Sequence, residues 1–171
     1  EPTVFRNILM TACDMNEFDW AEGFIEKYSS ELPAEFAESM KNHAYGTLYF
    51  NKGEFEKALK FIANIKYDYL RHKIDVKVLQ FKIFYELGEY EPAFSILDTL
   101  RHYISSSEEI AQLVRTRCSG FIKYAGELLR ARSSVSGKAG KRAFHTGEIL
   151  ARLQAESAVE SAAWLKKKLQ G

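Results

Sequence analysis

The amino-acid sequence predicts an all-α protein, a solenoid of helix-turn-helix repeats followed by helical capping segments. Three observations lead to this fold class. The 171 residues include only 3 Pro and 10 Gly, too few for the turns that many short strands would need. A six-residue pattern recurs three times at a nearly constant spacing. Each copy follows one amphipathic stretch of helical periodicity and begins another.

The composition is that of a globular chain, with 46% hydrophobic and 27% charged residues. No run of about 18 apolar residues occurs, so the sequence predicts no membrane span. The chain begins with Glu1 and has no basic-then-apolar leader, as we expect of a fragment or a processed chain. Cys13 and Cys118 are too few for a disulfide framework, so we expect free buried thiols and a reducing, cytoplasmic location.

Charge is distributed unevenly along the chain, although the net charge is only +1. Residues 1–60 carry eleven acidic and six basic side chains, whereas residues 61–171 carry twelve acidic and eighteen basic ones. The sequence therefore predicts an acidic end and a basic end, which affects the choice of partner more than the fold.

The recurring pattern occupies residues 16–21 (NEFDWA), 53–58 (GEFEKA) and 88–93 (GEYEPA), so its copies begin 37 and 35 residues apart. The first position is Asn16, Gly53 or Gly88, residue types that tolerate the left-handed conformation in which many helices end. A Glu follows, near the positive end of the next helix dipole. The last position is always Ala, which indicates close contact between two helices.

The pattern resembles the tetratricopeptide repeat family, in which a small residue and aromatics on the first helix are followed by an Ala on the second. The middle copy matches best, with Tyr45-Gly46-x-x-Tyr49 and Ala58-x-x-x-Ile62. The outer copies have larger residues at the Gly46 position, and no copy ends in the family's Pro. The resemblance covers about residues 3–103 and implies a right-handed α–α superhelix of three repeats over residues 1–104. A plain helical bundle is the alternative.

Residues 105–171 lack the repeat, and we expect them to form a helical segment that caps the array. Ser106-x-x-Glu109 and Ser157-x-x-Glu160 predict the starts of two helices as capping boxes. Another helix is expected over about 141–154, after a basic loop near 133–140. The ending 163–169 (AWLKKKL) is similar to the close of some bacterial repeat proteins, which implies no activity.

The resemblance also implies a binding surface, because in this family the first helices of successive repeats line a concave groove. Placed in register, the residues of this predicted concave groove are Arg6, Met10, His43, Thr47, Phe50, Val78, Lys82 and Tyr85. Such a mixed surface suits a peptide or a helix, so we expect a protein-interaction or scaffold module. A second copy of the chain, in a homodimer, is the alternative occupant. The carboxylate clamp of chaperone-binding members is not expected, because Met10 and Thr47 stand at its Asn positions.

Residue types that could carry catalysis or hold a metal form no recognisable motif in the sequence. The four histidines are dispersed, and no H-E-x-x-H, C-x-x-C or G-x-S-x-G spacing occurs. The stretch 137–142 (GKAGKR) lacks the earlier glycine and the preceding strand of a phosphate-binding loop. We therefore expect no catalytic activity, no cofactor and no metal.

Basic side chains accumulate in the tail and suggest nucleic-acid binding as the alternative function. This possible basic patch comprises Arg115, Arg117, Lys123, Arg130, Arg132, Lys138, Lys141 and Arg142. Phe121 and Tyr124 lie near these cations in the sequence, a combination that suits a nucleic-acid backbone and its bases. A solvated helix face is the competing interpretation.

Overall fold

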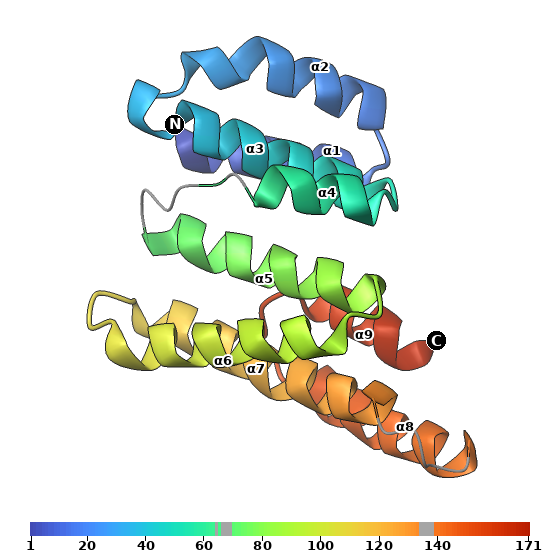
Figure 1. The fold of residues 1–171 in the computed structure, drawn as a ribbon. Helices are drawn as coiled ribbons and strands as arrows, with labels where there is room; N and C mark the ends of the chain where they lie inside the picture. The colour runs from blue at the N-terminus through green and yellow to red at the C-terminus, as the bar shows by residue number, and fades with distance from the viewer. Residues whose placement is uncertain (64, 66–69, 134–138) are drawn as a thin grey trace. The chain divides into compact units, whose positions relative to one another are not determined.

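The computed structural model describes residues 1–63, 65, 70–133 and 139–171 (Figure 1). These residues form nine α-helices and one short 3₁₀ helix, and no strand occurs among them, which confirms the predicted all-α class. The chain divides into two compact units, Glu1–Glu89 and Tyr90–Gly171. Within the described ranges, no helix combines the length and the apolar character that a bilayer crossing requires.

The first unit contains two complete helix pairs and one further helix. Its elements are α1 (Pro2–Asp14), α2 (Phe18–Tyr28), the 3₁₀ helix η1 (Ser29–Glu31), α3 (Ala34–Asn51), α4 (Phe55–Ile62) and α5 (Leu70–Glu86). Helix α3 packs against α1, α2 and α4, and α5 packs against α3 and α4. Each helix of this unit is therefore stacked on those that precede it in the chain (Figure 1).

The three copies of the six-residue pattern form the same turn. Asn16, Gly53 and Gly88 have φ values of 60°, 80° and 74°, which confirms the left-handed residues predicted at these positions. In each turn the N–H of this residue donates to the carbonyl three residues earlier at 3.1 Å. The next N–H donates to the carbonyl five residues earlier at 2.9 Å. This pair of bonds is a Schellman motif, which satisfies carbonyls that the end of a helix leaves open.

Helix boundaries recur with the turns. Helices α1, α3 and α5 end two residues before the left-handed residue, and α2, α4 and α6 (Tyr90–Ser106) begin two residues after it. Equivalent helix boundaries therefore recur 37 and 35 residues apart, as the copies of the pattern do in the sequence.

The alanine that ends each pattern copy is buried, with 0% of its surface exposed at Ala21, Ala58 and Ala93. In the middle pair the cause lies at Gly46 of α3. A Cβ atom placed on Gly46 would lie 2.4 Å from Cδ1 of Ile62 and 3.6 Å from the carbonyl oxygen of Ala58. Helices α3 and α4 thus approach so closely that neither small residue has room for a larger side chain.

The second unit is built around one long helix. It contains α6, α7 (Gln112–Ser133), α8 (Ala139–Ala155) and α9 (Ala162–Gln170). Helix α7 packs against α6, α8 and α9, and its Phe121, Tyr124 and Leu128 are each 0% exposed. Helix α8 corresponds to the helix predicted over 141–154, whereas most of the predicted basic loop (134–138) lies outside the described residues.

The capping box predicted at Ser106 is wrong. Ser106 still belongs to α6, where its hydroxyl donates to the carbonyl of Tyr103, and α7 begins only at Gln112. Leu113 consequently falls in the first turn of α7 with 64% of its surface exposed.

The capping box predicted at Ser157 is wrong as well, because α9 begins at Ala162 after a left-handed Ser161. Glu160 faces Arg117 of α7 instead, with Oε2 and Nη2 3.3 Å apart, and its N–H donates to the carbonyl of Arg117. The carboxylate of Glu160, which the spacing assigned to a helix start, therefore makes a tertiary contact instead.

The boundary between the compact units falls at the third turn, between Glu89 and Tyr90. The predicted division into 1–104 and 105–171 marks the place where the sequence repeat ends, which is a different criterion from compactness. That division stays a prediction.

Candidate functional site

The structure buries half of the predicted concave groove. His43, Thr47, Val78 and Tyr85 are only 4–8% exposed. The other four members, Arg6, Met10, Phe50 and Lys82, are half-buried. Of this set, the structure brings Lys82 and Phe50 together, with Nζ of the lysine 5.9 Å from the ring centroid. With four of its eight positions buried, the predicted set does not line a channel that is open along its whole length.

A polar cluster joins two members of the predicted concave groove, Arg6 and His43, to residues of α5. Arg6 of α1 pairs with Asp75 of α5, with Nε 2.7 Å from Oδ2 and Nη2 3.2 Å from Oδ1. His43 of α3 meets His72 of α5 edge to face, with the ring centroids 5.2 Å apart. Burial, then the charges of His72 and Arg6, lowers the pKa of His43 to about 3. The cluster ties α1, α3 and α5 together and leaves His43 neutral near pH 7.

Four members of the possible basic patch are engaged within the second unit. Arg115 donates to the carbonyls of Ile104 and Ser107, and Arg132 donates to the carbonyl of Lys168. Arg117 pairs with Glu160, as described above, and Lys123 pairs with Glu156.

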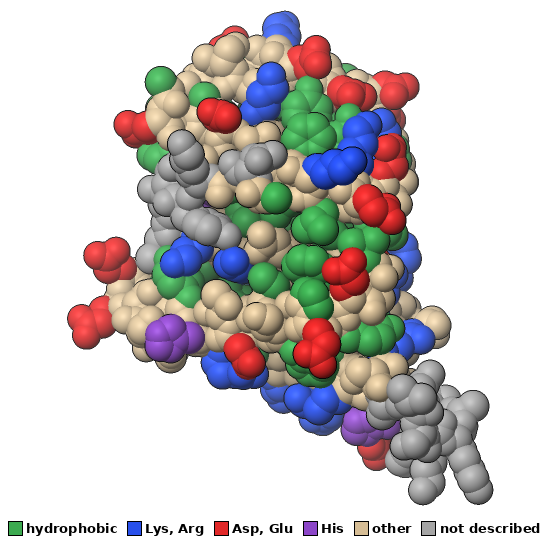
Figure 2. Space-filling model, in the orientation of Figure 1, with side chains coloured by type: hydrophobic (Ala, Val, Ile, Leu, Met, Phe, Trp, Pro, Cys, Tyr) green, Lys and Arg blue, Asp and Glu red, His purple; other side chains and the backbone are tan. Residues whose placement is uncertain are grey.

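The remaining members of the patch divide between exposed and undescribed positions. Arg130 is exposed, Lys138 lies outside the described residues, and Lys141 and Arg142 lie in α8 without described side chains. Arg115 and Lys123 do line a hollow of about 450 Å³ together with Arg101. Lys and Arg side chains also gather at the lower edge of the face in Figure 2.

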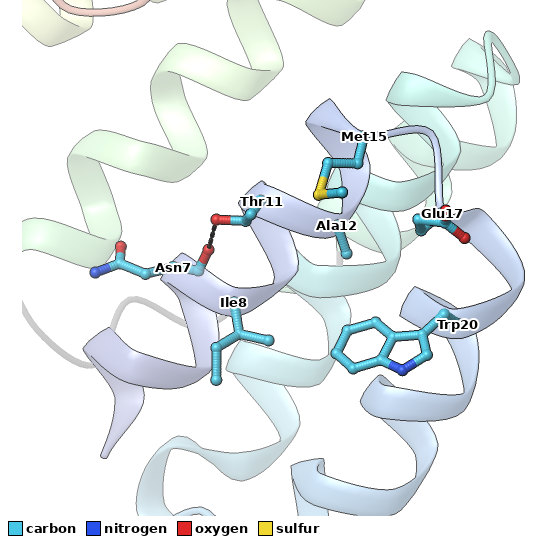
Figure 3. A pocket seen from close by; sticks show the side chains of 7 residues that line it. All are labelled: Asn7, Ile8, Thr11, Ala12, Met15, Glu17 and Trp20. Atoms are coloured by element: carbon cyan, nitrogen blue, oxygen red, sulfur yellow. Dashed lines mark hydrogen bonds between the residues drawn. The ribbon is translucent and has the colours of Figure 1, made fainter.

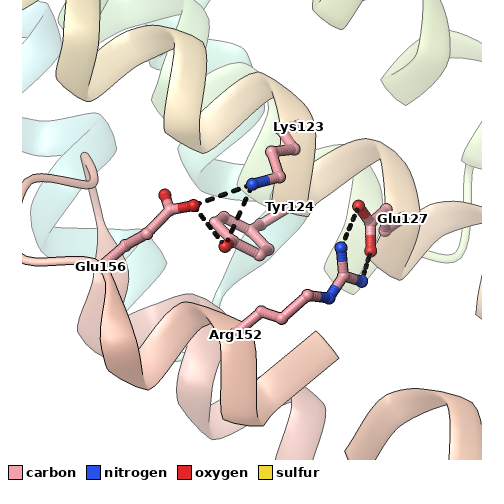
Figure 4. A network of polar contacts seen from close by, with 5 residues as sticks. All are labelled: Lys123, Tyr124, Glu127, Arg152 and Glu156. Atoms are coloured by element: carbon pink, nitrogen blue, oxygen red, sulfur yellow. Dashed lines mark hydrogen bonds and ion pairs between the residues drawn. The ribbon is translucent and has the colours of Figure 1, made fainter. Parts of the chain in front are cut away.

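A polar network joins α7 to α8 and to the residue after it (Figure 4). Glu156 accepts hydrogen bonds from Lys123 Nζ at 2.8 Å and from the Tyr124 hydroxyl at 2.7 Å, while Arg152 makes a two-pronged contact with Glu127. The bonds from Lys123 and Tyr124 lower the pKa of Glu156. Glu156 thus pairs with Lys123, a member of the possible basic patch, and Glu127 pairs with Arg152.

An apolar hollow lies on the first helix pair and is absent from the sequence-based set. We call it the α1–α2 hollow; it is lined by Asn7, Ile8, Thr11, Ala12, Met15, Glu17 and Trp20 and has a volume of about 480 Å³. Figure 3 shows the Trp20 indole extending from α2 toward Ile8 of α1, with Met15 at the end of α1 and Glu17 in the turn. Apolar atoms thus form its floor, and polar groups lie at its edge.

A second hollow of about 390 Å³ continues this surface, sharing Ile8 and Trp20 with the first. Aromatic rings line it along α2: the Trp20 and Phe24 rings stack at 5.2 Å, and Phe24 lies 5.0 Å from Tyr28. Val4 adds a further apolar side chain, and the carboxylates of Glu1 and Glu31 border the hollow.

Exposed large apolar side chains concentrate on this helix pair. Four of them lie here, 38–65% exposed: Val4, Ile8, Met15 and Trp20. Among the described residues, Leu113 is the one other large apolar side chain that is exposed. Single exposed apolar residues are ordinary on protein surfaces, but a cluster bordered by polar groups is typical of an interaction site.

The described residues include two thiols and several dispersed side chains of metal-ligating type. Cys13 and Cys118 are free and buried, as predicted, and burial together with the charge of Asp14 raises the pKa of Cys13 to about 11. A thiol with so high a pKa is a poor nucleophile near pH 7. No group of three or more metal-ligating side chains occurs in the described ranges.

Sequence reasoning missed the α1–α2 hollow, although a signal was present. Val4, Ile8 and Met15 follow a helical spacing on α1, and Trp20 stands where the other two pattern copies have Lys57 and Pro92. A short helix with two neighbouring apolar stripes is expected to be covered on two faces. In the structure, only one of these faces of α1 is covered. No protein-family model, no curated protein and no solved structure matches this chain.

Proposed function

We propose that this protein is a protein-interaction module that binds a polypeptide partner on the α1–α2 hollow. The observation that carries this proposal is the gathering of four exposed apolar side chains around two adjoining hollows on the first helix pair, three of them lining the α1–α2 hollow. Covering such surface removes apolar area from water and stabilises a complex in proportion to the area buried. Trp20 is the natural anchor, since a large ring in a concave apolar site is the commonest kind of interface hot spot.

We also propose that the helix pairs continue the tetratricopeptide-like plan, a right-handed superhelix of repeats. The three identical Schellman turns and the three fully buried alanines support this architecture. Repeats of this kind bury one face of each helix pair against a neighbouring pair. The α1–α2 hollow lies on the face of the first pair that corresponds to a covered face of the second pair.

The experiment that tests the function is a selection of displayed random peptides against the whole chain, followed by affinity measurements on the enriched sequences. We expect Ile8→Glu and Trp20→Glu each to weaken binding of those peptides by roughly 30-fold, the effect of a loss of about 2 kcal/mol at a hot spot. Fluorescence anisotropy of labelled peptides measures the change.

Leu113→Glu is the matched control, because Leu113 is comparably exposed but lies in α7. It should leave the affinity unchanged. Peptides that bind all three variants equally, or a selection that enriches none, would contradict the proposal. Circular dichroism confirms that each variant keeps its helices.

A further inference from the structure

We infer that the occupant of the α1–α2 hollow is an amphipathic helix with an apolar contact face and basic flanks, seated there as α2 is seated on the second helix pair. This inference rests on the proposed function and adds the class of partner. It follows from comparing the same face of the first two helix pairs, which the recurring turns place in register 37 residues apart.

In the second pair this face is closed. The positions that correspond to Asn7, Ile8 and Thr11 are Ala44, Tyr45 and Leu48, and these three are only 0–8% exposed. By contrast, Asn7, Ile8 and Thr11 are all exposed. The same face of a first helix is therefore open in one pair and covered in the next.

Helix α2 provides part of the cover on the second pair. The hydroxyl of Tyr45 donates to Glu26 at 3.1 Å, and that of Tyr49 donates to Glu22 at 3.3 Å. Lys52 Nζ lies 3.7 Å from the other oxygen of Glu22. Two carboxylates four residues apart on a helix thus contact two phenol hydroxyls and a lysine. The element that covers this face is a helix, and hydrogen bonds and an ion pair hold it there.

In the first pair, each residue that would contact these carboxylates is replaced by an apolar residue. Tyr45 and Tyr49 correspond to Ile8 and Ala12, and Lys52 corresponds to Met15. Lys57, whose Nζ lies 3.7 Å from the Tyr49 ring centroid, corresponds to Trp20. The four apolar replacements all line the α1–α2 hollow. A helix seated here must therefore present apolar side chains where α2 presents carboxylates, because a buried carboxylate without a partner is costly.

The charge around the hollow determines the flanks of the partner helix. Residues 1–32 carry seven acidic side chains and two basic ones, and Glu1, Glu17 and Glu31 line the two hollows. Both basic side chains already have contacts, since Arg6 pairs with Asp75 and Lys27 lies over the Tyr28 ring. Lys and Arg beside an apolar stripe complement this rim, whereas Asp and Glu are repelled by it.

Four labelled 18-residue peptides test the inference by fluorescence anisotropy on the full chain. The first has a Leu and Met stripe at helical spacing with Lys and Arg flanks. The second has the same stripe with Glu flanks, the third is a scramble of the first that keeps its composition, and the fourth is the first with two central Pro residues. We expect the first to bind best and the others to bind at least roughly tenfold more weakly, with the flank effect shrinking as salt is added.

A double variant, Met15→Lys with Trp20→Lys, gives the hollow the lysines of the second pair at positions that are 65% and 54% exposed. It should lose the first peptide by at least roughly tenfold. It should gain a peptide whose stripe carries two Glu four residues apart, copied from Glu22 and Glu26. Leu113→Lys is the control and should bind the four peptides as the wild type does.

The possible outcomes separate the inference from the proposed function. Equal binding of the scrambled or Pro-containing peptide, lost in Trp20→Glu, would overturn the helix while the interaction function stands. A preference for Glu flanks would overturn the basic partner. Binding of none of the peptides, together with a concentration-dependent dimer abolished by Trp20→Glu, would identify a second copy as the occupant and overturn the inference.

Discussion

His43 is a buried neutral histidine, and its burial makes the stability of the fold depend on pH. Its pKa falls from an ordinary value of 6.5 to about 3 in the folded protein, first because of burial and then because of the charges of His72 and Arg6. The unfolded chain takes up a proton there below about pH 6.5, whereas the folded chain does not. We expect the free energy of unfolding to drop by about 2 kcal/mol between pH 7 and pH 5 from this group alone.

Urea titrations at the two pH values measure this drop. His43→Gln should remove about that much of the difference between pH 7 and pH 5, whatever it does to stability at pH 7. His102→Gln, at an exposed position, should retain the full difference. A pH dependence unchanged by His43→Gln would show that protonation of this ring does not oppose folding.

The residues that the sequence predicted well are those whose role is local. The left-handed conformation of Asn16, Gly53 and Gly88 follows from residue type and position at the end of a helical stretch. The sequence did not predict the burial of Thr47, Val78 and Tyr85. Register places a side chain on one side of a helix, but it does not determine which later helix covers that side.

At the scale of the helix pair, one buried and one exposed helical glycine should respond in opposite ways to one added methyl group. Gly46→Ala should lower the free energy of unfolding by about 1–3 kcal/mol, because the new Cβ would meet the side chain of Ile62, which is 2% exposed. Gly23→Ala in α2 should raise it by about 0.5–1 kcal/mol, because no atom lies within 4 Å and Ala is the better helix former.

Thermal and urea unfolding of the two variants provide the measurement. Because the change in composition is the same, a difference of sign isolates the packing of α3 on α4 from helix propensity. Stabilisation by both substitutions would mean that α3 and α4 separate easily enough to accept a methyl group.

The helices of the tail show where local signals fail. The Ser-x-x-Glu spacings at Ser106 and Ser157 predicted two helix starts, yet Ser106 lies inside α6 and Glu160 pairs with Arg117. Near the second of these helix starts, Glu160 contacts a side chain far away in the sequence, which periodicity does not report. The all-α class was predictable from composition and repeat, whereas these boundaries depend on tertiary contacts.

For the whole molecule, each compact unit should respond separately to a cavity in its own core. Leu48 of α3 is 0% exposed and packs in the core of the first unit. Leu48→Ala should destabilise that unit by about 2–5 kcal/mol. We expect amides of α1, α3 and α4 to exchange their hydrogens faster, while amides of α7 and α9 in the second unit keep their protection.

Hydrogen exchange read out by mass spectrometry distinguishes the units peptide by peptide. Leu128→Ala, a buried leucine of α7, is the reciprocal variant and should affect the second unit first. Equal loss of protection in both units for either variant would show that the chain unfolds as one cooperative block.

The α1–α2 hollow is not among the surfaces that the sequence predicted. Three repeats without a catalytic motif indicated a binding surface, but the family resemblance placed it along the first helices, half of whose predicted contacts are buried. The α1–α2 hollow is recognised by a comparison that needs the structure. Tyr45 and Leu48 are covered in the second pair, whereas their counterparts in the first pair, Ile8 and Thr11, are uncovered.

The identical turns also bear on how such a surface can arise in evolution. The bonds that hold each turn are between backbone groups, and they require one residue that accepts a positive φ, while one nearby position must stay as small as Ala. Most other positions differ between the first and the second helix pair. Exchange of four side chains, as between Tyr45, Tyr49, Lys52 and Lys57 and their counterparts in the first pair, is enough to turn an internal seam into a site for a new partner without altering the fold.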